Sequence, residues 1–395
     1  MGKTGGYGLT ALGMVCALGN ECGEILSRAM AGSTEGMVPC RGILPDGAVS
    51  PFGRVELTRE QVAAAPSRCE ALLWAAATQI LPAIEEAGRT CSPERIGVVI
   101  GTSNSTMEEF TANPDRIDMS TPALFLKRRL GIGGPAFVVS TACSSSAKAF
   151  ASARRLLEGG LCERVLVGGV DSFSRVVENG FFALEALSQR PTAPLCRERD
   201  GINLGEGAAL FIMGRERGEV SLRGIGESSD AYHLTAPDPE GRGAEQAMRA
   251  ALEDAGLAPE EIDLIHMHGT GTRYNDVMES LAIERIFGTR PLCCSTKQMT
   301  GHTLGAAGAI SLGLCWLMLK VRSGALPHVM NGSRDKGLPA LSLSRPGNRD
   351  PVRTVLANAF AFGGSNASVI LQRAALPEEG VSDRICSQKG ENKGV

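Results

Sequence analysis

One cysteine of this sequence stands where a thiol could act as a nucleophile. Cys143 lies in VVSTACSSSAKAF (138–150), between a short run of β-branched residues and a run of small residues and good helix formers. A helix N-terminus stabilises a thiolate through its free N–H groups and its dipole. The neighbours Ala142, Ser144 and Ser145 are small and would let a substrate come close. We therefore predict that Cys143 is a nucleophile and that the other cysteines are buried and inert.

A cysteine nucleophile needs partners, and the sequence has only five histidines. His268 ends a strand-like run and is followed by the turn sequence GTGT, which would expose its ring. His302 lies in STKQMTGHTLGAAG, just before a Gly/Ala-rich helix. We predict these two as the partners, and we interpret His266 as a core residue because it lies deeper on the same strand.

A zinc site is the rival interpretation of this region. His266, His268, Cys293 and Cys294 would be its ligands. Structural zinc sites usually show paired C-x2-C or H-x3-5-H spacing, and neither is present here. We therefore expect neither a metal nor another cofactor.

The elements that must position these residues follow from hydrophobic periodicity. Strands are expected at 95–103, 136–141, 164–172 and 207–216, with a helix that starts near 144 and stops at Gly159 and Gly160. The same order restarts after about Gly224, with a helix at 244–257, a strand at 261–272, a helix at 302–320 and a hairpin-like pair at 354–372. This alternation is typical of an α/β fold with buried sheets. We expect two related halves, 1–223 and 224–373, and a disordered tail at 374–395.

Composition narrows the class of protein. A chain of 395 residues with a net charge of -3 and no long basic run gives no hint of nucleic-acid binding. Twelve scattered cysteines in so large a chain indicate reduced thiols and a cytoplasmic location. The N-terminal segment resembles a signal peptide only weakly, and we interpret it as a first strand. The apolar stretch Leu304–Leu319 is shorter than the ~20 residues that span a bilayer, which favours a buried helix and no membrane contact.

Five motifs together resemble one family. They are TACSSS around Cys143, HGTGTRYND around His268, STKQMTGHTLGAAG around His302, NAFAFGGSN near the end, and RERDGINLGEGAAL at 197–210. In this order, from about Tyr7 to Arg373, they are similar to the β-ketoacyl-acyl carrier protein synthases of types I and II. STACSSSAKAFASARRLLEGG, GGVDSF and GFFALEALS look most like the aryl-polyene-type ketosynthases, which work beside a chain-length-factor partner.

The resemblance implies a fold and a reaction. The fold is the thiolase fold, with two duplicated α/β halves in α-β-α-β-α layers, assembled as a homodimer or as a heterodimer with a chain-length-factor-like subunit. The reaction is a decarboxylative Claisen condensation. Cys143 would take an acyl group from acyl-ACP as a thioester, and malonyl-ACP would then lose carbon dioxide and supply the attacking enolate.

The resemblance also implies roles for individual residues. His268 and His302 would hydrogen-bond the enolate oxygen, and Lys297 would orient them. The family usually carries an acid where this chain has Ser311, so Lys297 is expected to lean on Asp276 or Glu279 instead. Thr270 and Thr272 would support this part of the site.

The acyl-enzyme step would need an oxyanion hole and a gate. The backbone N–H groups of Cys143 and Phe362 would form the hole, Phe362 would close over the thioester, and Gly363 and Gly364 would let that loop come near. An acidic carrier protein would dock on positive charge, for which Arg190 and Arg68 are the candidates.

Three alternatives remain open. A housekeeping fatty-acid elongation synthase of type II would carry the same motifs. A non-catalytic partner subunit would lack Cys143 or the histidines, and none is missing. A thiolase would carry a second catalytic cysteine in the loop that here reads FAFGGSN.

Overall fold

The computed structural model describes residues 6–42, 44–110 and 118–375. The predicted disordered tail at 374–395 lies outside this range except for its first two residues. Eleven strands form one hydrogen-bonded sheet, whose two halves meet where β1 pairs with β8 at only two positions, Tyr7 with Leu222 and Gly8 with Ser221. The strands of the N-terminal half are β1 (Tyr7–Val15), β4 (Ile96–Gly101), β5 (Ala136–Val139), β6 (Arg164–Asp171) and β7 (Gly207–Gly214). Those of the C-terminal half are β8 (Val220–Ser229), β9 (Leu264–His266), β10 (Leu292–Cys294), β11 (Ser342–Leu343), β12 (Thr354–Phe360) and β13 (Ser365–Arg373).

The two halves repeat one topology. Outward from their junction, the strand order is β1-β7-β6-β4-β5 in one half and β8-β13-β12-β9-β10 in the other, with β11 added at the far edge. In both halves the first two pairings are antiparallel and the last two are parallel. The predicted duplication is therefore confirmed by strand order, although the letters of the two halves show no clear repeat.

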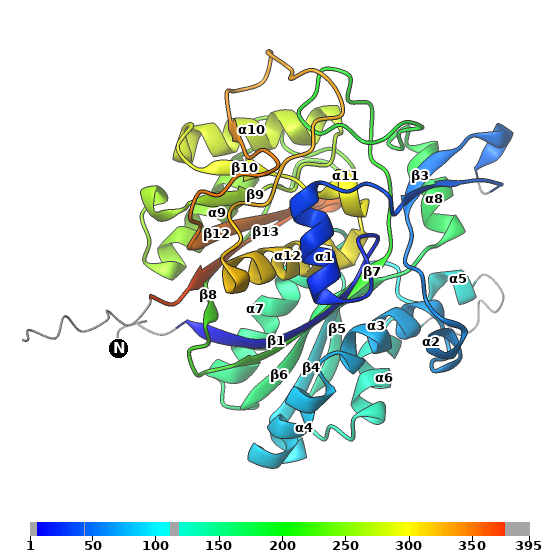
Figure 1. The fold of residues 1–395 in the computed structure, drawn as a ribbon, viewed down its shortest axis with the longest axis vertical. Coiled ribbons are helices and arrows are strands. Elements are labelled where there is room, and N and C mark those ends of the chain that lie inside the picture. The colour runs from blue at the N-terminus through cyan, green and yellow to red at the C-terminus, as the bar shows by residue number, and fades with distance from the viewer. Residues whose placement is uncertain (1–5, 43, 111–117, 376–395) are drawn as a thin grey trace, which may run out of the picture.

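Helices complete five layers. The central layer consists of α7 (Ser145–Glu158) and α12 (Ala307–Val321), which contact strands of both halves. Figure 1 shows them between β12 and β13 on one side and β1 and β6 on the other. The outer layers are α3 (Arg68–Thr78) with α6 (Thr121–Arg129) on the N-terminal half, and α9 (Arg242–Ala255) with α10 (Arg273–Phe287) on the C-terminal half. This is the predicted α-β-α-β-α order.

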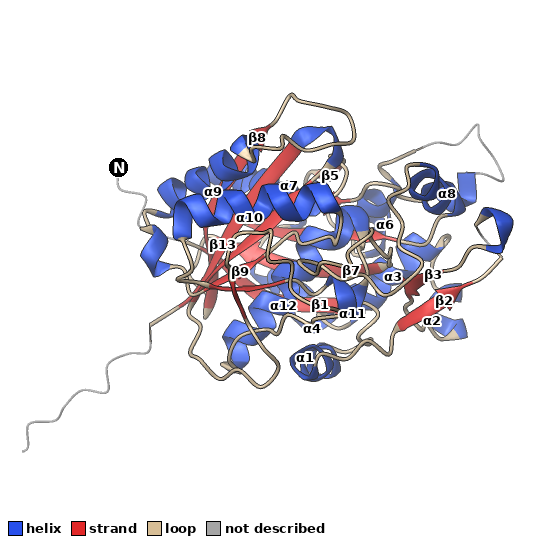
Figure 2. Ribbon diagram, turned by 90° about the horizontal axis from the view of Figure 1, so that it is seen from above, coloured by secondary structure: helices blue, strands red, loops and turns tan. Residues whose placement is uncertain are grey.

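The remaining elements lie around this stack (Figure 2). A two-stranded hairpin stands apart from the main sheet, and helix α8 follows β6. Their bounds are β2 (Met37–Cys40), β3 (Ser50–Gly53), α1 (Cys22–Ala31), α2 (Arg59–Ala63), α4 (Leu81–Thr90), α5 (Met107–Phe110), α8 (Arg175–Ala183) and α11 (Lys297–Thr300).

The apolar helix predicted at 302–320 is the core of the molecule. Within the described ranges, Leu304–Val321 has the length and apolar composition of a membrane span, and 89% of it is buried inside the protein. A helix that is hydrophobic on all sides is typical of a central layer. Both half-sheets cover α12, which explains its composition.

The second half begins before Gly224, the residue at which the sequence pattern placed its start. Gly224 lies inside β8, so a boundary between residues 223 and 224 would cut a continuous strand. A Cβ at Gly224 would stand 2.3 Å from the carbonyl oxygen of Ala251 in α9. This glycine therefore serves close helix-to-strand packing and does not break the strand.

Candidate active site

The loop between β5 and α7 presents the predicted nucleophile. Cys143 follows Ala142, whose φ of 51° is unusual for a residue with a side chain. The thiol is buried, and the backbone N–H groups of Cys143 and Phe362 lie close enough to its sulfur to lower the pKa of the thiol. The structure therefore brings the sulfur and the two predicted oxyanion-hole donors together.

Burial dominates the titration of this thiol. It raises the pKa of Cys143 to about 12, although the positive charge of Lys297 and the two N–H groups act in the opposite direction. The negative charge of Asp171 adds to the rise. Burial therefore opposes the thiolate form of Cys143, which the N–H groups and the dipole at the start of α7 favour.

The two predicted histidines meet at this sulfur. His302 Nε2 lies 3.0 Å from Cys143 Sγ, and the rings of His268 and His302 pack edge to face with centroids 5.2 Å apart. Burial, and then the charge of Lys297, hold the pKa of both imidazoles well below the ordinary value. Both rings are consequently neutral, and each keeps one N–H donor and one acceptor nitrogen.

Lys297 supports His268 from behind. It is the first residue of α11, and its Nζ donates a hydrogen bond to the carbonyl oxygen of His268. Burial lowers the pKa of this ammonium to about 8, against the opposing effect of Glu279, Cys143 and Asp276.

The predicted partnership of Lys297 with an acid takes an indirect form. Glu279, on α10, accepts hydrogen bonds of 2.7 Å from the backbone N–H groups of both His268 and Gly269. In the part of the chain that the structure describes, no ion pair within 4.0 Å joins Lys297 to Glu279 or Asp276. Both carboxylates favour the charged lysine over a longer distance.

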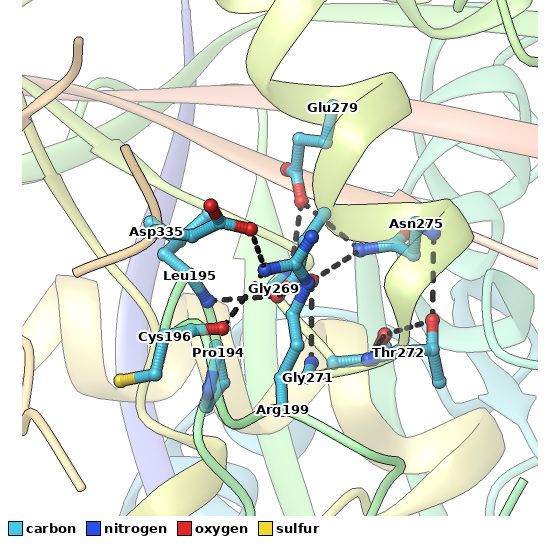
Figure 3. A network of polar contacts seen from close by, with 12 residues as sticks. Pro194, Leu195, Cys196, Arg199, Gly269, Gly271, Thr272, Asn275, Glu279 and Asp335 are labelled. Atoms are coloured by element: carbon cyan, nitrogen blue, oxygen red, sulfur yellow. Dashed lines mark hydrogen bonds and ion pairs between the residues drawn. The ribbon is translucent and has the colours of Figure 1, made fainter. Parts of the chain in front are cut away.

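A second buried carboxylate, Asp276, holds the turn that follows His268. Figure 3 shows the polar contacts around this turn, with Gly271, Thr272 and Arg199 labelled. Asp276 accepts hydrogen bonds from the N–H groups of Leu195 at 2.8 Å and Gly271 at 3.2 Å. Arg199 lies 3.9 Å from Asp276 and 2.5 Å from Asp335, so it connects the turn with the RERDG segment and with a surface loop. In this turn, Thr270 and Thr272 contact each other through their hydroxyls, 3.0 Å apart.

Phe362, the predicted gate, lines the same cavity as Cys143. The ring of Phe362 stacks on Phe181 of α8, with centroids 5.6 Å apart. Gly363 and Gly364 have φ values of 79° and 72°, a region that favours glycine. The N–H of Gly363 donates to the carbonyl oxygen of Leu234 at 2.7 Å, which ties the gate to a neighbouring loop.

One cavity of about 420 Å³ connects these groups to the surface. Cys143, His268 and His302 line its floor, and Phe362 lines its wall. Thr270, Thr272, Arg273, Tyr274 and Asp200 are also among its lining residues. The mouth carries Leu184 and Tyr274, which are 52% and 74% exposed.

The two candidate docking arginines differ in their surroundings. Arg68 turns inward, where its guanidinium binds the buried carboxylate of Glu206 and the carbonyl oxygen of Val55. This ion pair speaks against Arg68 as a docking residue, because the buried carboxylate of Glu206 requires the cation as its partner. Arg190 is 63% exposed in its side chain and pairs with Asp200 at 2.7 Å.

The residues of the rival zinc interpretation do not form a metal site. His266 Nε2 contacts the hydroxyl of Thr296 at 3.1 Å, and burial lowers the pKa of this imidazole to about 3. Across residues 6–42, 44–110 and 118–375, no group of three His, Cys, Asp or Glu could hold a metal ion.

Three residues at or near the site had no role predicted from the sequence. Phe181 carries the ring on which the gate stacks, and it appeared only as part of a family-like segment. Arg199 lies in the RERDG motif, whose role was not assigned. Asp171 directly follows the buried run VLVGGV, and an acid at the end of a buried strand is a signal that could have been used.

Comparisons with known proteins agree with this site. The family model of the β-ketoacyl synthase N-terminal domain matches residues 56–218, and that of the C-terminal domain matches residues 220–333. The 3-oxoacyl-[acyl-carrier-protein] synthase 2 of Coxiella burnetii is 32% identical over 323 residues, which cover 73% of this chain and 77% of that protein. Nodulation protein E of Rhizobium meliloti is 36% identical over 63% of this chain and 64% of its own length.

Solved structures give the same result over nearly the whole chain. The ketosynthase ApeO, in complex with its chain length factor ApeC from Xenorhabdus doucetiae, has a TM-score of 0.88 and 41% identity over 95% of this chain and 99% of that one. The ishigamide ketosynthase/chain length factor structure has a TM-score of 0.83 at 25% identity, over 94% and 100% of the two chains. The five motifs predicted an acyltransferase with a thiolase-like fold, and the comparisons confirm both. Because both domain models match, the chain belongs to the β-ketoacyl synthase family.

Proposed function

We propose that this protein elongates an acyl chain by decarboxylative condensation on Cys143, in an aryl-polyene-type pathway and beside a chain-length-factor partner. The observation that carries the proposal is the position of Cys143 Sγ. It lies 3.0 Å from His302 Nε2, close to the backbone N–H groups of Cys143 and Phe362, in a cavity of about 420 Å³. These are the groups that acyl transfer to a thiol requires.

In the first half-reaction, Cys143 takes the acyl group. Sγ attacks the thioester carbonyl carbon of acyl-ACP while the S–H proton moves toward His302 Nε2. The N–H groups of Cys143 and Phe362 hold the oxygen that becomes negative. The carbon–sulfur bond to the carrier then breaks, and the carrier thiol leaves with the proton. Because the resting pair is a neutral thiol beside a neutral imidazole, the proton moves during the attack and not before it.

In the second half-reaction, malonyl-ACP supplies the carbon nucleophile. Loss of carbon dioxide leaves an enolate whose oxygen needs hydrogen-bond donors. Neutral His268 and His302 can each donate one, and Lys297 holds the His268 backbone and adds a positive charge nearby. The enolate carbon attacks the Cys143 thioester, the carbon–sulfur bond breaks, and the β-ketoacyl product stays on the carrier. The released Cys143 thiolate then takes up one proton from water, which restores the resting thiol.

The arm that delivers the substrate would pass through the cavity mouth. Thr270 and Thr272 line it and offer hydroxyls to a polar, amide-bearing chain. Phe362 would swing away from Phe181 to admit the acyl group.

A partner subunit would cover the edge of the N-terminal half. The outermost strand there is β5, whose residues Ala136 to Val139 are apolar and only half-buried. An edge strand of this kind is typically paired or covered in the assembled protein. The likeness to a ketosynthase solved with its chain length factor supports a heterodimer, and a homodimer is the alternative. All eleven cysteines of the described residues are free thiols, which supports a cytoplasmic location.

A housekeeping role in fatty-acid elongation is the second candidate. The 32% identity with a 3-oxoacyl-[acyl-carrier-protein] synthase 2 favours it. The higher identity of 41%, over nearly the whole chain, with a ketosynthase solved beside a chain length factor favours the first.

Mass spectrometry separates these possibilities. The protein is incubated with a panel of acyl-carrier proteins, polyunsaturated and saturated, and the acyl mass is mapped to a residue. We expect one acyl group on Cys143 that is absent in Cys143→Ser, with polyunsaturated chains loaded preferentially. Loading on another cysteine would contradict the mechanism, and a preference for saturated chains would favour fatty-acid elongation.

The half-reactions are tested separately with His302→Ala. We expect Cys143 still to acylate, but more slowly than in the wild type because His302 no longer accepts the thiol proton. Release of carbon dioxide from malonyl-ACP should fall by ~10²–10³, the usual effect of removing one oxyanion donor. Wild-type decarboxylation in this variant would exclude the assigned role of His302.

A further inference from the structure

A buried carboxylate outside the cavity touches both halves of the site. Asp171, the last residue of β6, is fully buried and is not among the residues that line the cavity. Its oxygens accept hydrogen bonds from the turn after β4, namely from the N–H groups of Ser103 and Asn104 and the hydroxyls of Thr102 and Ser103. They also accept the N–H of Gly305 at 2.6 Å, from the other half of the molecule.

Gly305 lies just after His302, the residue proposed above to accept the Cys143 proton. His302 precedes it by three residues, and Leu304 between them has a φ of 52°. A non-glycine residue in this region persists only when its surroundings hold it there. A Cβ at Gly305 would stand 2.4 Å from Ser103 N and 2.8 Å from Asp171 Oδ2. The segment that carries His302 is therefore pressed against Asp171 with no room to shift.

The contacts of Asp171 favour its charged form, although burial raises the pKa of this carboxyl above its ordinary value. The N–H groups of Ser103, Asn104 and Gly305 can only donate, and between them they engage both carboxylate oxygens. Within the described residues, no ion pair within 4.0 Å neutralises Asp171. Its uncompensated negative charge raises the pKa of Cys143, whereas Lys297 lowers it.

The duplicated topology supplies a counterpart. In the C-terminal half, Glu279 accepts the backbone N–H groups of His268 and Gly269, directly after β9. In the N-terminal half, Asp171 accepts those of Ser103 and Asn104, after β4, which is the strand equivalent to β9. Each half thus fixes the same turn with a buried carboxylate, and only Asp171 also reaches across to the other half.

We propose that Asp171 is a positioning residue: it fixes the segment that carries His302 against the half that carries Cys143. The proposal rests on the roles proposed above for Cys143 and His302. The other titratable groups near Asp171, Cys143 and His302 are His268, Lys297 and the buried Cys69 of α3. None of them bridges the two halves as Asp171 does.

Asp171→Asn tests this positioning role in the full chain with its partner. Either orientation of the amide places an NH2 group against the N–H of Asn104 or of Gly305, so one contact is lost and the charge disappears. We expect kcat for condensation to fall by at least about tenfold, because small displacements of catalytic groups have large effects on rate. KM for acyl-ACP should not change, since Asp171 does not line the cavity.

The pH dependence of thiol alkylation distinguishes this role from a merely structural one, because a structural role of Asp171 would leave that dependence unchanged in the variant. The rate at which iodoacetamide modifies Cys143, mapped by mass spectrometry, should rise at lower pH in Asp171→Asn than in the wild type. A folded variant with wild-type kcat, or with an unshifted alkylation profile, would overturn the proposal.

Ser103→Ala provides a second test of the positioning role, which remains available if Asp171→Asn does not fold. This change keeps the charge but removes the hydroxyl that donates to Asp171 at 2.7 Å and accepts the N–H of Gly305 at 3.2 Å. We expect a kcat reduced several-fold, with an unchanged KM and an unchanged alkylation profile. Wild-type kcat in this variant would contradict the positioning role. His302→Ala is measured in parallel. If this variant keeps wild-type kcat, the proposed function is wrong. If His302→Ala lowers kcat but neither Asp171→Asn nor Ser103→Ala does, only the present inference is wrong.

Discussion

At the scale of single residues, burial determines which groups are charged. His268 and His302 are neutral, Lys297 has a pKa of about 8, and the Cys143 thiol has a pKa of about 12, each mainly through desolvation. Removing water disfavours the charged form of every one of them. A site of neutral donors and acceptors suits a reaction in which negative charge appears only transiently on a thioester oxygen.

Burial also shifts the pKa of Glu178, a residue that does not line the cavity. It lies on α8, is 2% exposed, and burial raises its pKa from 4.5 to about 7. Between these values the folded state binds a proton that the unfolded state has lost, so the free energy of unfolding falls as pH rises from about 4.5 to about 7. Each pKa unit corresponds to about 1.4 kcal/mol, which makes the total loss about 3 kcal/mol.

Glu178→Gln should remove this loss. We expect the variant to match the wild type at pH 4 and to exceed its free energy of unfolding by about 3 kcal/mol at pH 8, measured by urea denaturation. Glu185→Gln, at an exposed position near the same helix, is the matched control and should change stability little at either pH. An equal difference between Glu178→Gln and the wild type at both pH values would show that the Glu178 carboxyl is not desolvated.

At the scale of elements, the duplicated halves place equivalent loops at one point. Cys143 lies after β5 and before α7, and His302 lies after β10 and before α12. β5 and β10 hold the same place in their half-sheets, and α7 packs on α12 in the central layer. The nucleophile and the base therefore come from corresponding segments of the two halves, and they meet because the central helices pack side by side.

The gate is a short element whose contacts differ from those of the core. Phe362 stacks on Phe181 and lines the cavity, whereas Phe150 is fully buried in α7. Phe362→Ala should slow condensation with acyl-ACP, because the gate can no longer close over the thioester. It should lower the free energy of unfolding by only about 1 kcal/mol, whereas Phe150→Ala should cost about 3–5 kcal/mol.

Turnover assays and thermal unfolding of both variants check the role of the gate. A loss of stability in Phe362→Ala as large as that in Phe150→Ala would show that Phe362 is a core residue. Normal condensation in a stable Phe362→Ala variant would exclude the gating role.

At the scale of the whole molecule, recognition of a carrier protein depends on charge near the cavity mouth. The chain has a net charge of -3, so attraction of an acidic carrier must come from local positive groups. Arg190 is exposed, but its ion pair with Asp200, a residue that lines the cavity, offsets part of its charge.

Arg190→Glu should raise KM for acyl-ACP, and the effect should shrink at high salt, where exposed charges are screened. Turnover with a small acyl thioester that has no carrier should stay at the wild-type value. Arg89→Glu is the control, since it breaks a similarly exposed ion pair, with Glu86 on α4. Equal losses with both substrates, or an equal effect of Arg89→Glu, would refute docking at Arg190.

Much of this protein was predictable from local sequence. Continuous runs of Val, Ile and Leu gave the strands β4, β6 and β7, and Gly159 and Gly160 marked the end of α7. The turn position of Cys143 and the glycine-flanked His268 and His302 indicated the reactive groups. These signals are local because backbone propensity and side-chain alternation act between near neighbours.

Only the tertiary structure decided the rest. Arg68 reads as a surface charge until Glu206, 138 residues away, is placed beside it. Cys143 reads as an activated thiol until the whole fold buries it. Asp171 gains its contact with Gly305 only when the two halves pack together. The sequence determined which residues could react, whereas their charge states and alignment depend on desolvation and on contacts between distant segments, which no local pattern contains.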